Sequence, residues 1–579
     1  MALSSQPTNH HMWMLKTKSV LMGASEEQLH GLGSNPLAKK RCIKGFNSEE
    51  NSYHVACACP TSSRTTRHDF VVHWTLKTLL KSLGAPEGAQ RSLQFGKAAQ
   101  TLTALFRKMP LSSPQKPGNT TAKASKDGVI SEENCSDNNG MPIKKEVVPV
   151  GTTIHKEQPF VYSLSSKYRT ECCDFCLKMG TDLLKCSNCK YVYYCGQACQ
   201  KQAWAVHKQE CKNLKRINPR ILPDAARILF RLIRKLDKGG ATVKGYYTEK
   251  NYRLWMDLMS HCEELKNDKR RMEHMSSLYA VLTEFQQEEL PNFAEFMGLY
   301  GRMCVNSFNI CNQEQQSLGV GIYLAASIID HSCQPNALAT FEGTTLILRT
   351  LETLPELDWS KVRISYIDVM ATTEERRKDL LETYYFLCEC PKCLAPENLV
   401  EIFGAQCPNK CCDNYIGISD NESVCAKCNT VATQEFINEF KKVVEITEMH
   451  INLDVCKVCL AKQKNVLYKY HLRRIKTLDL AFESAIDLED FDSALEYGLE
   501  LIDSYQKYYP TIHPLTGLLH LKLCKLLLFK NRTKEGIYHL RKASDILKIT
   551  HGITNSVYKI EVLPLIQQCR FVLNINGLK

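Results

Sequence analysis

Apolar residues recur at helical spacing in two long stretches of this chain. One contains "AARILFRLIRKL" and "RMEHMSSLYAVLTEF", and the other runs from about residue 436 to the end. Apolar positions three and four residues apart form one face of a helix. We therefore expect helical regions at 212–300 and 436–579.

Two other stretches have a different pattern. "VVPVGTTIHKEQPFVYSL" (147–164), "TTLILRTL" (344–351) and "VRISYIDVM" (362–370) are rich in β-branched and aromatic residues, with Gly and Pro as breaks. Such runs are typical of short strands. Together with the helical stretches they predict a multidomain α+β protein.

The two ends of the chain differ in regularity. Residues 1–140 lack sustained periodicity, and 111–140 are rich in Ser, Asn, Lys and Gly, so we expect a disordered extension with one short amphipathic helix at 70–84. Near the other end, residues 492–514 correspond to 534–556 at an offset of 42 positions. This weak repeat favours stacked helical hairpins like tetratricopeptide repeats, although those are usually about 34 residues long. An ordinary helical bundle is the alternative.

Length and composition narrow the class of protein. A chain of 579 residues is too long for one core, and its 44% apolar and 23% charged content is ordinary for a soluble protein. No window offers about 18 uninterrupted apolar residues, and no secretory leader is visible, so we expect a cytoplasmic and nuclear protein. The net charge of +12 permits contact with acidic partners such as chromatin, or is a solvated basic surface.

Cysteine is the most informative residue type. The chain has 28, many in pairs two or three positions apart, and in a reducing compartment such pairs bind metal. Residues 173–211 offer eight ligands, enough for two closed tetrahedral sites of the structural Zn²⁺ kind. These ligands are Cys173, Cys176, Cys186, Cys189, Cys195, Cys199, His207 and Cys211.

Two further cysteine clusters follow. In "FLCECPKC", Cys388, Cys390 and Cys393 leave a tetrahedral zinc one ligand short. In "CPNKCCDNYIGISDNESVCAKC", a zinc ribbon of two knuckles would use Cys407, Cys425, Cys428 and either Cys411 or Cys412. The sequence leaves the choice between the two adjacent cysteines open, and we take Cys411 as the provisional ligand. Cys456 and Cys459 have no obvious partner pair, so core or surface positions on a helix are expected.

The spacing of residues 173–211 matches the MYND zinc finger. This finger, followed by "GVGIYLAASIIDHSCQPNA" and "ISYIDVM", makes the chain resemble the SET and MYND domain family of protein-lysine N-methyltransferases from about residue 140 to the end. The resemblance implies a SET domain split by the finger. It implies these segments: 141–172 first part of the SET domain, 173–211 finger, 212–300 helical insert, 301–370 core SET domain, 371–396 post-SET zinc segment, 397–435 Cys-rich insertion, and 436–579 helical domain.

The resemblance also implies how the metals are bound. In the family the two finger sites interleave, so Cys173, Cys176, Cys195 and Cys199 would bind one zinc, and Cys186, Cys189, His207 and Cys211 the other. Pairing by sequence neighbours is the alternative. Cys333 would supply the missing fourth ligand of the post-SET zinc. Such fingers bind short proline-containing peptides.

The motif "IIDHSCQPN" is implied to lie beside the methyl donor, S-adenosylmethionine. Residues implied to contact this donor are His261, Asn306, Ser327, Asp330, His331 and Phe386, the last by stacking on adenine. Asp330 and Met259 depart from the family, which usually has Asn and Glu there. Asn138-Asn139-Gly140 stands where a Gly-x-Gly motif is expected, and this change weakens the expectation of donor binding.

Tyr366 in "ISYIDVM" is the expected catalytic residue. Methyl transfer needs the lysine nitrogen aligned with the methyl carbon and sulfur, and a tyrosine hydroxyl can position the amine without acting as a base, because a phenol is protonated near neutral pH. We predict a monomeric, zinc-containing lysine methyltransferase acting on a histone or non-histone protein. The alternatives are a catalytically weak adaptor and, on zinc and charge alone, a DNA-binding regulator.

Overall fold

The structure, a computed structural model, describes residues 146–419, 423–447 and 453–575. From Val147 on, these residues belong to one compact unit. The disorder predicted for 1–140, the helix predicted at 70–84 and the Asn-Asn-Gly stretch at 138–140 lie outside the described residues.

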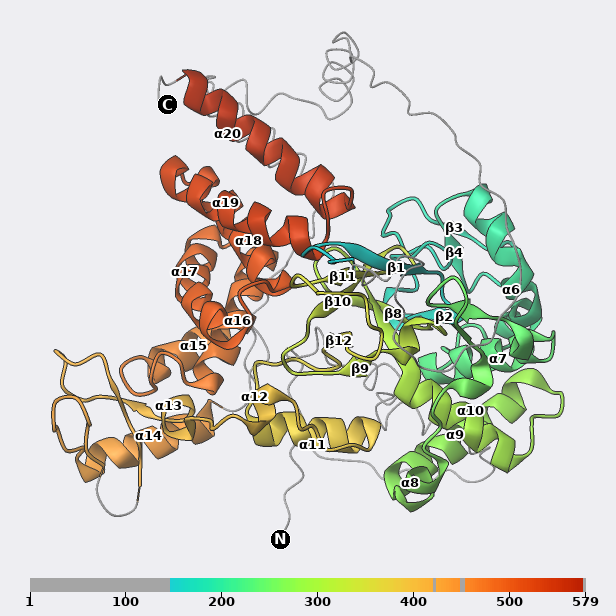
Figure 1. Cartoon of the computed structure of the whole chain (residues 1–579), viewed down its shortest axis with the longest axis horizontal. Coiled ribbons are helices and arrows are strands. Elements are labelled where there is room, and N and C mark those ends of the chain that lie inside the picture. Colours follow the sequence, from blue (N-terminus) through green and yellow to red (C-terminus); the bar gives the residue numbers. More distant parts are fainter. Residues whose placement is uncertain (1–145, 420–422, 448–452, 576–579) are drawn as a thin grey trace, which may run out of the picture. The chain divides into compact units, whose positions relative to one another are not determined.

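Two antiparallel three-stranded sheets form the β-rich core (Figure 1). The first contains β1 (Thr153–Glu157), β11 (Thr345–Thr350) and β10 (Ala337–Glu342), and the second contains β2 (Val161–Leu164), β8 (Ser317–Ile322) and β7 (Ser307–Cys311). Each sheet thus pairs a strand from before residue 165 with strands from after residue 306. The insertion of residues 165–306 between paired strands is the arrangement expected of a split domain.

A parallel pair of two-residue strands joins this core to the predicted active-site motif. β9 (Asp330–His331) pairs with β12 (Arg363–Ile364), and the short helix η5 (Ala326–Ile328) directly precedes β9. The segment that contains His331 and the one that contains Tyr366 are therefore neighbours.

Between β2 and the second half of the core the chain forms the finger and a helical insert. The finger contains β3 (Leu184–Lys185), β4 (Tyr193–Tyr194) and α6 (Gln197–Ile217), after the turn η2 (Ser166–Tyr168). The insert contains α7 (Asp224–Leu236), η3 (Gly240–Thr242), β5 (Gly245–Tyr246), β6 (Tyr252–Arg253), η4 (Trp255–Asp257), α8 (Cys262–Asn267), α9 (Lys269–Gln286) and α10 (Phe293–Asn306). The sequence pattern predicted only helices in this region, so the small hairpin of β5 and β6 was not expected.

Short elements follow the core. Thr372 caps α11 (Thr373–Tyr384) in a capping box with Glu375, which satisfies the free N–H groups of the first turn. Beyond it lie α12 (Pro391–Leu394), α13 (Leu399–Ile402) and the hairpin of β13 (Ala405–Gln406) and β14 (Tyr415–Ile416).

The rest of the described chain is helical. Its elements are α14 (Gln434–Ile446), α15 (Leu453–Gln463), α16 (Leu472–Asp487), α17 (Phe491–Tyr508), α18 (Pro514–Phe529), α19 (Thr533–Thr550), η6 (Val557–Val562) and α20 (Leu563–Ile575). Successive helices from α14 to α19 pack on one another, and the two halves of the sequence repeat fall mainly on α17 and α19. At Gly498 a Cβ atom would lie 2.6 Å from the Phe482 ring, so glycine allows α16 and α17 to approach closely.

The α+β fold class is confirmed, with a β-rich core, cysteine clusters and a domain of packed C-terminal helices. The segment limits proposed from the sequence stay predictions. Among the described residues, no helix is both long enough and apolar enough to cross a bilayer.

Candidate active site and metal centres

Four cysteines from two distant segments meet beside the core. Cys333, Cys388, Cys390 and Cys393 have Sγ atoms that all lie within 4.8 Å of one another, with Cys333 and Cys393 3.5 Å apart. Tetrahedral Zn–S bonds of about 2.3 Å place sulfur atoms about 3.8 Å apart, so the cluster fits Zn²⁺. Cys333 therefore joins the loop after β9 to the segment that runs from the end of α11 through α12, as the resemblance implies.

His331 connects this cluster to the tyrosine. Its Nδ1 accepts a hydrogen bond from the Tyr366 backbone N–H at 2.9 Å, and its Nε2 lies 3.2 Å from the Cys333 sulfur. Burial and the nearby Arg376 guanidinium lower the pKa of His331 to about 3, so the imidazole is neutral. Because Nδ1 is an acceptor, the single ring proton is on Nε2 and points at the sulfur.

The side chain of Tyr366 lies in an aromatic cluster. Its ring centroid is 4.9 Å from that of Tyr384 and 5.3 Å from that of His331, and Phe386 is 6.0 Å from His331. The Tyr366 hydroxyl donates to the carbonyl of Ile329. Burial, with a smaller contribution from the Asp330 charge, raises the pKa of Tyr366 above its ordinary value, so the hydroxyl acts as a protonated dipole and not as a base.

Asn306 and His261 lie together on the insert side. The Asn306 amide nitrogen donates to the carbonyls of Met259 and Arg302, at 2.9 and 2.8 Å, which fixes the turn leading to His261. A Cβ at Gly301 would lie 2.1 Å from the Ser260 carbonyl oxygen, so only glycine lets α10 approach this turn so closely. The His261 ring in turn lies 5.4 Å from that of Tyr385, next to Phe386.

Ser327 and Asp330 are placed differently from each other. Ser327 Oγ donates to the Leu324 carbonyl at 2.7 Å and accepts from Arg253 at 3.2 Å. The Asp330 side chain is 75% exposed and lies 3.8 Å from Arg363. Neighbouring side chains of a strand point to opposite sides. Because the His331 side chain points into the protein, the Asp330 side chain points outward.

One residue that organises this region was missed from the sequence. Glu157 on β1 accepts hydrogen bonds from the backbone N–H groups of Ala325 and Ala326, both at 2.9 Å, one on each carboxylate oxygen. It therefore caps the turn η5, which is followed directly by Ile329, whose carbonyl accepts from Tyr366, and by β9 with His331. Nothing in the local pattern around Glu157 points to a partner 168 residues away. Tyr384 was missed as well, because it reads as an ordinary residue of α11.

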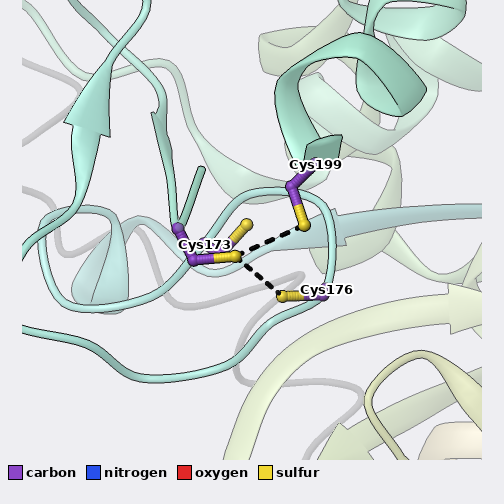
Figure 2. Close-up of side chains that lie close together, drawn as sticks. Cys173, Cys176 and Cys199 are labelled. Atoms are coloured by element: carbon purple, nitrogen blue, oxygen red, sulfur yellow. Dashed lines mark hydrogen bonds between the residues drawn. The ribbon is translucent and has the colours of Figure 1, made fainter. Parts of the chain in front are cut away.

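The finger ligands form two interleaved clusters. Cys173, Cys176, Cys195 and Cys199 form one, and Figure 2 shows the sulfurs of Cys173, Cys176 and Cys199 converging. In the second, His207 Nε2 lies 3.4 Å from Cys186 and 3.6 Å from Cys189, and Cys186 lies 3.8 Å from Cys211. The alternative of pairing by sequence neighbours is therefore wrong.

A fourth cluster contains Cys407, Cys412, Cys425 and Cys428. The choice of Cys411 is corrected to Cys412, because Cys411 is exposed and its thiol lies outside the cluster. The turn after Cys407, in which the Cys412 N–H donates to the Asn409 carbonyl at 2.8 Å, directs Cys412 inward. Cys456 and Cys459 are buried on α15 and belong to none of the clusters found in the described chain.

The β core is built from two separated parts of the chain, and the Cys333 loop places His331 beside Tyr366. With the two clusters of the finger, this arrangement is that of a SET-type methyltransferase with an inserted MYND finger. Comparison with known proteins agrees: residues 173–211 match the family model of the MYND finger. The chain is 31% identical to the human histone-lysine N-methyltransferase SMYD3, over 72% of this chain and 92% of that protein.

Other relatives extend this likeness. The chain is 30% identical to the histone-lysine N-methyltransferase ASHR1 of Arabidopsis thaliana, over 71% of this chain and 89% of that protein. It is 26% identical to the human N-lysine methyltransferase SMYD2, over 73% of this chain and 94% of that protein. The chain belongs to the SET and MYND domain family of protein-lysine N-methyltransferases.

Proposed function

We propose that this protein transfers a methyl group from S-adenosylmethionine to a lysine side chain of a protein. The observation that supports this most is the closure of the Cys333 loop onto Cys388, Cys390 and Cys393. That closure holds His331 next to Tyr366. Relatives named for histone-lysine and for general lysine methylation make histone and non-histone proteins the candidate substrates.

The residues around Tyr366 fit the methyl donor. The Phe386 ring offers an apolar face for adenine. Asn306, whose amide nitrogen is engaged with two backbone carbonyls, offers its carbonyl oxygen to the ammonium group. His261 and Ser327 add polar groups, and Asp330 contributes through its position in β9 more than through its exposed carboxylate. When bound, the donor supplies a methyl group already activated on a sulfonium.

The chain's own groups would align and desolvate the lysine amine. The Tyr366 hydroxyl is fixed on the Ile329 carbonyl, and Tyr384 and His331 pack against its ring, so the dipole is preorganised. A lysine entering this apolar surrounding is favoured in its neutral form, since burial disfavours the charged ammonium. Orienting the amine can lower the barrier by several kcal/mol.

We also propose structural Zn²⁺ at all four clusters: two in the finger, one at Cys333 and one at Cys407–Cys428. Each offers four protein ligands, as closed structural sites do. The finger is proposed to bind proline-containing peptides. We place the protein in the cytoplasm and nucleus, as a monomer that reaches chromatin through its substrates.

The test is a titration with S-adenosylmethionine together with a methylation assay on histones and a peptide pool. We expect saturable donor binding, lost on His331→Ala. Tyr366→Phe should retain donor binding while kcat falls by about 10²–10³-fold, the usual effect of removing one preorganised donor. Tyr538→Phe, at an exposed tyrosine, is the matched control. Donor binding without methyl transfer to any substrate would favour the adaptor alternative.

A further inference from the structure

Two of the three arginines of helix α7 are buried. Arg227 and Arg231 are one turn apart on the same face, and their side chains are 4% and 5% exposed. A guanidinium does not lose its proton in a protein, so each of these buried charges needs a partner.

The partners come from the finger. Asp174 lies 2.7 Å from Arg227 and 2.8 Å from Arg231, and Glu210 lies 2.7 Å from each of the two arginines. Burial raises the pKa of Glu210, but the two arginines outweigh it and hold that pKa well below its ordinary value. The four side chains form a neutral ion-pair cluster, which we call the buried quartet.

The buried quartet contacts a metal ligand. Glu210 Oε1 lies 3.4 Å from Nδ1 of His207, while Nε2 of the same ring faces the sulfurs of Cys186 and Cys189. A carboxylate on the distal nitrogen of a ligating histidine fixes its tautomer and orientation. Asp174 also directly follows Cys173, a member of the first cluster, in the sequence.

We propose that Arg227 and Arg231 are positioning residues for the finger's Cys/His metal site, although they belong to the helical insert. Their contacts with Glu210, at 2.7 Å each, hold its carboxylate in the place from which it orients His207. Arg231 also donates to the Tyr162 carbonyl on β2 at 2.8 Å, which ties the quartet to the core sheet. Metal binding by the finger and its docking on the insert are then one equilibrium, and the finger is not an independent module.

The test measures the rate of zinc release and not catalysis, so its result does not depend on the proposed methyl transfer. The full-length protein is loaded with zinc, and release to a chelator is timed for the wild type, Glu210→Gln, Arg227→Gln and Arg234→Gln. Arg234 lies on the same helix but is paired at the surface with Asp237 and Glu288, so it is the matched control. We expect one zinc ion to leave about 10-fold faster or more in the first two variants, and no change in Arg234→Gln.

Cobalt substitution identifies the ion that leaves. A site with one imidazole and three thiolates absorbs differently from a site with four thiolates, so bleaching of the imidazole-containing site alone supports the proposal. If Arg227→Gln does not fold, Arg227→Gln with Asp174→Asn keeps the quartet neutral and is used instead. Release at the wild-type rate, or simultaneous loss of all the zinc ions, would overturn the proposal.

Discussion

At the scale of single residues, the hydrogen bond from the Tyr366 backbone to His331 sets the orientation of both side chains. Because the Tyr366 backbone N–H occupies Nδ1 of His331, the imidazole presents its proton to the Cys333 sulfur, where an N–H donor stabilises a thiolate. The same contact fixes the backbone from which the Tyr366 hydroxyl reaches Ile329. His331 therefore supports the metal cluster and the tyrosine at once.

Glu157 provides a test at this scale. In Glu157→Gln one carboxylate oxygen becomes an NH₂ group, so one of the two N–H groups at Ala325 and Ala326 loses its acceptor. A lost buried hydrogen bond costs about 1–3 kcal/mol. We expect kcat/KM to fall about 10-fold, with zinc content unchanged, in a steady-state methylation assay.

The control for this variant is Glu342→Gln, since Glu342 accepts a backbone N–H, that of Ser556, outside the site. Equal activity of Glu157→Gln and the wild type would show that the turn η5 does not need its cap.

Some elements are too short to be stable alone. The strands β13 and β14 have two residues each, and isolated hairpins even longer than these are only marginally stable. Cys407, Cys412 and Cys425 pack with Ile416 of β14, so the metal proposed for this cluster would contribute directly to folding of the hairpin.

The adjacent cysteines allow a matched comparison within this element. Cys412→Ser should lower the zinc content by one ion per chain, whereas Cys411→Ser, which changes an exposed thiol outside the cluster, should leave it unchanged. Elemental analysis of the two purified variants measures this. The reverse result would restore Cys411 as the ligand.

The elements also show what a sequence can predict. Apolar periodicity predicted the helices from α7 to α10 and from α14 on, because a period of 3.6 needs only local information. The two-residue strands β5 and β6 are too short to show any period. Cysteine spacing predicted the metal clusters, but both Cys411 and Cys412 satisfy it, and the turn at Asn409 decides between them.

Contacts between distant parts of the chain could not be predicted in this way. Glu157 and Ala325, or Arg227 and Asp174, come together only through the tertiary fold, and no local pattern records such a pair. Resemblance to a family implied the closure of Cys333 onto the later thiols, but the spacing alone only showed that one ligand was missing.

At the scale of the whole molecule, one arginine connects the core sheet to the C-terminal helices. Arg349 on β11 donates to the carbonyl of Ile549 near the end of α19 at 2.8 Å, and also to Thr153 Oγ1 at 2.5 Å and the Gly151 carbonyl. The helical domain is thus attached to the same sheet that contains Glu157.

We expect Arg349→Gln to lower the free energy that stabilises this junction by about 1–2 kcal/mol, because hydrogen bonds from a charged donor are lost. Amide hydrogen exchange should become faster at Thr153 and at the end of α19 while the finger is unaffected. Lys548→Gln, at a surface ion pair with Asp545, should leave exchange unchanged. Unaltered exchange in Arg349→Gln would mean that other contacts carry the junction.

The thiol at position 333 has a consequence for how the protein is made. Because synthesis runs from the N-terminus, His331 and Tyr366 are made before Cys388, Cys390 and Cys393. The nascent chain therefore passes through a stage in which the Cys333 loop has no later thiols to close onto. A product that ends between residues 370 and 387 contains His331 and Tyr366 but lacks all three of the later thiols onto which Cys333 closes.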